Sequence, residues 1–89
     1  MRYHYEPITA DQFNAGLAEC GIPLRRFCRL TGADLRRAER WAKGEVPIPP
    51  WVGSYLGMLT VPAARAIAHA YAEAYATLAE TEDAPRANP

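Results

Sequence analysis

Residues 24–43 constrain the fold of this 89-residue chain more than any other segment. They hold seven of the ten basic side chains, set among apolar residues at helical spacing and interrupted once, by Thr31-Gly32. With only two acids the segment carries a charge of +5, and because the formal net charge is zero, the remaining residues carry −5. We therefore expect two short basic helices joined by a glycine turn, on a strongly polarised molecule.

Capping signals define the helices in this half of the chain. Thr9 begins a capping-box pattern, which predicts a helix that ends at Gly21. Pro23 suits the first turn of a second helix. Asp34 is a good N-cap for a third helix, which should stop at Gly44.

The second half of the chain predicts two more helices. A proline-rich loop precedes a fourth helix, which should end at Val61-Pro62. Nine of the nineteen residues in 62–80 are alanine, the best helix former, so a long fifth helix is expected there. Residues 1–8 are expected to form an extended arm and residues 81–89 a disordered tail.

Two short helices joined by a three- or four-residue turn with glycine form a helix-turn-helix unit, whose second helix enters the major groove of DNA. The unit needs a small side chain where the helices cross, here Cys28, and a turn residue that accepts a left-handed backbone, here Gly32. It also needs two buried residues three apart in the second helix, here Ala38 and Trp41.

On these residues the stretch from about residue 9 to 59 resembles the lambda-repressor-like (Cro/XRE) family, above all in GIPLRRFCRLTGADLRRAERWAKG. The resemblance implies a compact domain of four or five helices, dimeric on a near-palindromic operator, that regulates transcription. In size the chain is similar to short members from phages and mobile elements. Two departures stand out: Cys28 replaces the more usual alanine, and Leu24 stands where many members have a phosphate-binding glutamine.

The expected fold is therefore all-α, a compact four- to five-helix bundle with a helix-turn-helix motif. Residues 1–8 are the arm and residues 9–60 the DNA-binding domain. Residues 61–80 form the long C-terminal helix used for dimerisation, and residues 81–89 the tail.

The helical wheel of the third helix predicts which side chains read bases. Arg36, Arg40 and Lys43 fall within a sector about 60° wide, opposite the buried pair. Arginine can bond guanine bidentately, glutamate can accept from the cytosine amino group, and an apolar side chain can touch the thymine methyl. The expected base-reading residues are Arg36, then Arg40, with Glu39 and Leu35.

The other basic side chains of residues 24–43 are expected to bind phosphates, which orient a protein on DNA without reading its sequence. For Arg37 plain solvation is an equal alternative. The expected phosphate-binding residues are Arg25, Arg26, Arg29, Arg37 and Lys43.

An apolar stripe in the fifth helix has two interpretations. It could complete the monomer core or pair with its twin across a two-fold axis. A nineteen-residue helix spans about 28 Å, more than a small core covers, so we expect a homodimer. The stripe consists of Ala64, Ile67, Tyr71, Ala74 and Leu78.

The sequence favours a sequence-specific transcriptional regulator of double-stranded DNA, a homodimeric autorepressor on an inverted-repeat operator. The alternative is an antitoxin or adaptor-type module that binds an acidic protein partner. No nucleophile with a base, phosphate loop or paired metal-ligand motif is recognisable, so neither an enzyme nor a metal, cofactor or small-molecule ligand is expected. Cys20 and Cys28 should be small core residues. With no apolar run long enough for a bilayer and no signal peptide, the expected compartment is the cytoplasm.

Four residues of the arm, Arg2 to Tyr5, have two interpretations. They could reach into a minor groove or across to a second subunit. The commoner arrangement, packing on the chain's own body, is the one we expect.

Overall fold

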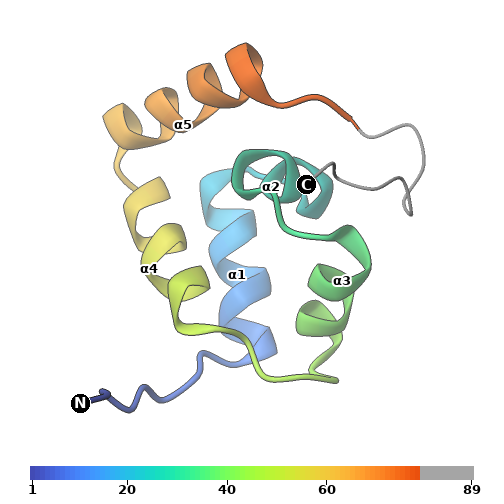
Figure 1. Cartoon of the computed structure of the whole chain (residues 1–89), viewed down its shortest axis with the longest axis vertical. Coiled ribbons are helices and arrows are strands. Elements are labelled where there is room, and N and C mark those ends of the chain that lie inside the picture. Colours follow the sequence, from blue (N-terminus) through green and yellow to red (C-terminus); the bar gives the residue numbers. More distant parts are fainter. Residues whose placement is uncertain (79–89) are drawn as a thin grey trace.

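The computed structural model describes residues 1–78 and places five helices and no strand in them (Figure 1). This confirms the expected all-α bundle. The predicted tail, residues 81–89, lies outside the described residues. The helices are α1 (Ala10–Cys20), α2 (Leu24–Thr31), α3 (Leu35–Lys43), α4 (Pro50–Leu59) and α5 (Pro62–Tyr75).

Local caps form where the sequence predicts them. The Thr9 hydroxyl accepts from the Gln12 N–H at 3.0 Å, and the Gln12 side chain accepts from the Thr9 N–H at 2.8 Å, which is a complete capping box. The Asp34 carboxylate accepts from the Arg37 N–H at 3.0 Å and so caps α3. Gly32 ends α2 with a φ of 79°, in the left-handed region. The basic segment therefore folds as two short helices separated by a tight turn.

Helix α1 lies between α4 and α3, with α2 packed against α3 (Figure 1). Phe13 of α1 is fully buried and meets two rings edge to face, Phe27 of α2 at 5.6 Å and Trp41 of α3 at 6.0 Å. From α4, Val52 is fully buried and Leu59 nearly so. The core is thus built around the aromatic cluster that joins the first three helices.

The C-terminal helix is shorter than predicted. Helix α5 ends at Tyr75, because Ala76 adopts an extended backbone, so residues 76–78 are not helical as expected. Thr77 and Leu78 are exposed, so no burial of their side chains stabilises a further helical turn. Residues 79 and 80 lie outside the described part of the chain.

The predicted stripe of α5 does not complete the core of this chain. Ala72 is the residue of α5 that is buried, whereas Ile67 and Tyr71 are 70% and 65% exposed. Ala72 therefore faces the body, while the large side chains of Ile67 and Tyr71 face outward. The other stripe residues follow no common pattern: Ala64 is half-buried, Ala74 is exposed, and Leu78 is exposed beyond the helix end.

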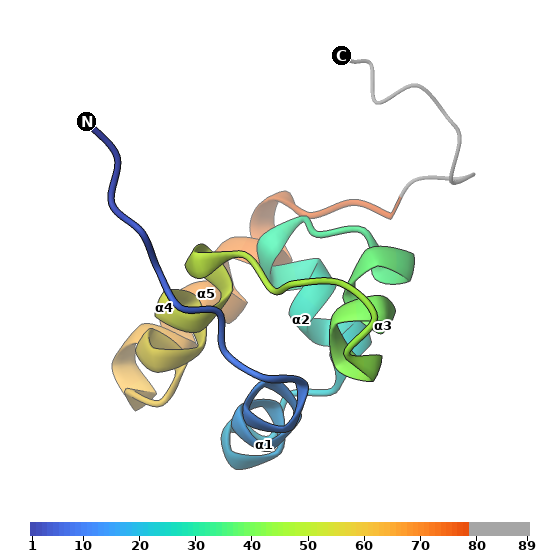
Figure 2. The same cartoon turned by 90° about the horizontal axis from the view of Figure 1, so that it is seen from below.

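The N-terminal arm also differs from expectation. Residues 1–7 are exposed and form no helix or strand, and they extend away from the body (Figure 2). Ile8 alone among the first eight residues packs against the core. Polar and aromatic side chains alternate here without an apolar partner on the body, so the packing we expected does not form.

The turn glycine provides a test of the fold. Gly32→Ala should destabilise the protein by about 1 to 2 kcal/mol, because an alanine at a φ of 79° is strained even though no atom lies within 4 Å of its Cβ. The matched control is Gly57→Ala, in the interior of α4, where an added Cβ also meets no atom within 4 Å. There alanine should stabilise by about 0.5 to 1 kcal/mol. Equal effects of the two substitutions in urea unfolding would contradict the strained turn.

Candidate nucleic-acid interface

Helix α3 presents one face to the core and the opposite face to solvent. Ala38 is fully buried and Trp41 is 2% exposed, as the sequence predicts. Arg36, Arg40 and Lys43 are exposed, and the carboxylate cap at one end and a left-handed glycine at the other fix where the helix begins and ends. The basic face therefore lies on a helix whose orientation the core determines.

The two other predicted base-reading residues border this face. Glu39 is exposed, and Leu35 is half-buried in the first turn of α3. The structure thus brings all four predicted base-reading residues onto one helix, with three of them exposed to solvent.

Cys28 is the small side chain of α2 that the helix-turn-helix prediction singled out. It is half-buried, and burial followed by the negative charges of Asp34 and Glu39 raises the pKa of its thiol above the ordinary value, while Arg25 acts in the opposite direction. The small side chain is packed against the core. A raised pKa also keeps the thiol protonated and unreactive.

The arginines of α2 do not share one environment. Arg25 and Arg26 are exposed, whereas Arg29 forms an ion pair with Glu73 of α5 at 3.4 Å. Helix α5 lies on the far side of α2 from α3 in both overall views (Figures 1 and 2). Arg29 is thus directed toward α5 and is less available to a phosphate beside α3 than the sequence suggests.

A cleft that sequence reasoning missed lies beside the basic face. It has a volume of about 440 Å³ and is open to solvent, and the loop of residues 46–49 forms its second wall. We call it the α3–loop cleft. Arg37, for which the sequence left phosphate contact and solvation open, lines it. The full lining is Asp34, Arg36, Arg37, Arg40, Trp41, Val46, Pro47 and Pro49.

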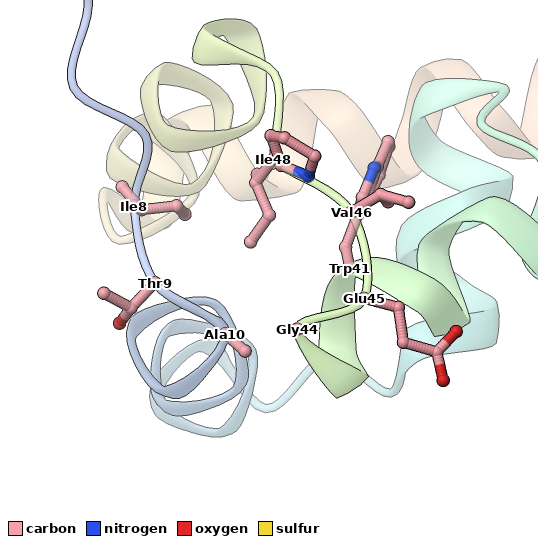
Figure 3. A pocket seen from close by; sticks show the side chains of 9 residues that line it. Ile8, Thr9, Ala10, Trp41, Gly44, Glu45, Val46 and Ile48 are labelled. Carbon is pink, nitrogen blue, oxygen red and sulfur yellow. The ribbon is translucent and has the colours of Figure 1, made fainter.

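A second cavity, of about 340 Å³, lies between the start of α1 and the same loop. Figure 3 shows Ile8 and Ile48 extending into it, with Trp41 beneath Val46. Its walls are mainly apolar side chains and main chain. It therefore offers little that would orient a polar substrate.

Residues 1–78 contain neither a candidate metal cluster nor a candidate membrane-spanning helix. No group of three or more His, Cys, Asp or Glu side chains gathers there as a metal site would require. In the same part of the chain, none of the helices is long and apolar enough to span a membrane.

Searches against family models, curated proteins and solved structures returned no match for this chain. Its function must therefore be argued from its own residues and their geometry.

Proposed function

We propose that this protein is a sequence-specific regulator of transcription that binds double-stranded DNA as a homodimer, in the simplest case an autorepressor on an inverted-repeat operator. One observation carries the proposal. Helix α3 buries Ala38 and Trp41 on one side and carries Arg36, Arg40 and Lys43 on the other, directly after a glycine turn from α2. If the basic residues of α3 were merely solvated, the helix would not need a second helix packed in this way against its buried face.

Electrostatics supports the same surface. The α2–α3 segment concentrates positive charge that phosphates attract without regard to sequence, while base edges in the major groove provide specificity. Arg36 and Arg40 are proposed to read bases, with Glu39 and Leu35 beside them. Arg25 and Arg26 are proposed to bind phosphates.

The homodimer is proposed through the outer face of α5. Ile67, Tyr71 and Tyr75 are 70%, 65% and 72% exposed, although all three are large and apolar or aromatic. The charged residues of α5 are directed elsewhere: Arg65 donates to the Leu59 carbonyl at 2.9 Å, and Glu73 pairs with α2. An uncharged patch of this kind on a small protein favours an interaction surface. Two copies would place their α3 helices on half-sites about 34 Å apart.

The alternative is a protein-interaction module that binds an acidic partner. The same exposed face of α5 and the basic face of α3 favour it as a second candidate. It differs from the leading proposal in one measurable respect, because such a module binds duplex DNA weakly and without a steep salt dependence.

Selection from random duplex DNA at two salt concentrations tests the DNA-binding proposal. An enriched inverted repeat whose affinity falls steeply with salt is expected. Failure to enrich any sequence, together with weak binding that salt hardly changes, would favour the protein-interaction module instead.

Two arginine substitutions separate base reading from phosphate binding. Arg36→Ala should lower affinity for the selected site by about 1 to 3 kcal/mol and relax its sequence preference. Arg25→Ala should weaken binding to all sequences alike and flatten the salt slope by about one unit. Arg29→Ala is the matched control, because its ion pair with Glu73 directs it toward α5, and it should change affinity less than Arg25→Ala. Equal losses on the selected site and on random DNA for Arg36→Ala would count against base reading.

The dimer is tested by placing a charge on the outer face of α5. Tyr71→Glu should convert a dimer into a monomer in sedimentation equilibrium, because two carboxylates would be buried in the interface. Ala15→Glu, at an exposed position of α1, should leave the mass unchanged. A wild-type chain that is already monomeric under these conditions would exclude the homodimer.

A further inference from the structure

Three cations of α3 meet no acid within residues 1–78. Arg37, Arg40 and Lys43 are exposed, and none of them forms an ion pair in that part of the chain. Glu39 lies four residues before Lys43 but does not pair with it, and the Asp34 carboxylate accepts from a main-chain N–H in capping the helix. We call these three residues the α3 cations. Since like charges on one helix repel one another, this surface favours an anion even before it meets DNA.

A cluster of acids follows the described part of the chain. Residues 24–43 carry a charge of +5, and the rest of the chain carries −5. Glu80, Glu82 and Asp83 place three of those acids within four positions, shortly after the described residues end at Leu78. Carboxylates and phosphates accept the same charge-assisted bonds from guanidinium groups. The acidic cluster and the DNA backbone therefore suit the same surface.

The chain leaves α5 in the direction of this surface. Helix α5 ends at Tyr75, and Ala76 is extended, with φ −84° and ψ 126°. Thr77 and Leu78 are exposed, and both overall views show residues 76–78 leading from the end of α5 toward the side of the molecule on which α3 lies (Figures 1 and 2). The end of α5 thus directs the acids that follow toward the basic helix.

The length of chain between Leu78 and the acids allows a contact along α3. An extended chain spans at most about 3.5 Å per residue, so Glu80 can lie about 7 Å beyond Leu78 and Asp83 about 17 Å beyond it. A helix of nine residues, such as α3, is about 14 Å long. Because the acids belong to the same chain, their effective concentration at α3 is on the order of millimolar, which favours even weak ion pairs.

We propose that residues 80–83 bind the α3 cations of the same chain in the absence of DNA and compete with DNA for α3. The carboxylates of Glu80, Glu82 and Asp83 accept from the guanidinium and ammonium groups that phosphates and bases would otherwise meet. The competition rests on the proposed function, because it presumes that α3 binds duplex DNA. It lowers the affinity for every duplex by the same factor, so that the tightest sites are occupied and weaker ones are not.

Two variants of the full chain test the competition, each replacing two glutamates by glutamine and one aspartate by asparagine. The tail variant is Glu80→Gln, Glu82→Gln and Asp83→Asn. The control variant has the same net charge and changes exposed residues of the arm and of α1, which are Glu6→Gln, Asp11→Asn and Glu19→Gln.

At low ionic strength the tail variant should bind a duplex of mixed sequence about threefold to tenfold more tightly than the control variant. The difference should disappear at high salt, because dissolved ions screen exposed ion pairs. Thermal unfolding establishes that both variants are folded.

The contact itself is tested without DNA, in the full chain labelled with ¹⁵N. The guanidinium Nε–H signals of Arg37 and Arg40 should differ between the wild type and the tail variant, and should be the same in the wild type and the control variant. Added salt should move the wild-type signals toward those of the tail variant.

The outcomes separate this inference from the proposed function. Arginine signals that are identical in the wild type and the tail variant would overturn the contact and leave the regulator intact. Equal affinities of the two variants for duplex DNA would overturn the competition, although DNA binding would stand. Failure of the wild type and of both variants to bind duplex DNA would overturn the competition together with the proposed function.

Discussion

The edge-to-face packing of Phe13 on Phe27 and Trp41 is the interaction on which the rest of the structure depends. A single fully buried ring of α1 touches both helices of the basic segment, so it fixes their relative orientation. The short loop between α2 and α3 could not do this alone, because two helices of eight and nine residues are marginal without tertiary packing. The exposed basic face is thus a consequence of what the opposite face buries.

The molecule separates its surfaces by chemistry. Positive charge gathers on α3 and the start of α2, whereas the large exposed side chains of α5, Ile67, Tyr71 and Tyr75, are uncharged. Helix α2 packs against both α3 and α5, and its Arg29 pairs with Glu73 of α5. This arrangement suits a protein that meets a polyanion on one side and a second copy on another, which is the combination proposed above.

Features set by a few neighbouring residues could be predicted from the sequence, and features set by tertiary contact could not. The caps at Thr9 and Asp34 and the glycine turn depend on local chemistry, and the buried pair of α3 follows from helical spacing. The end and the inward face of α5 could not be predicted, because alanine favours helix without marking an end. An alanine-rich helix also has apolar residues on both faces. The periodicity of the sequence therefore could not predict which face of α5 lies against the body of the protein. The α3–loop cleft requires residues 46–49 to return beside α3, which no local pattern encodes.

Arg29 and Glu73 form an ion pair between α2 and α5. Both side chains are substantially exposed, at 39% and 67%, so water and dissolved ions screen their attraction and its contribution is about 0 to 1 kcal/mol. The packing of α5 therefore depends on buried contacts such as that of Ala72 rather than on charge. Raising the ionic strength would therefore weaken the attraction of the basic face of α3 for a polyanion without disturbing the packing of α5, on which the proposed dimer depends.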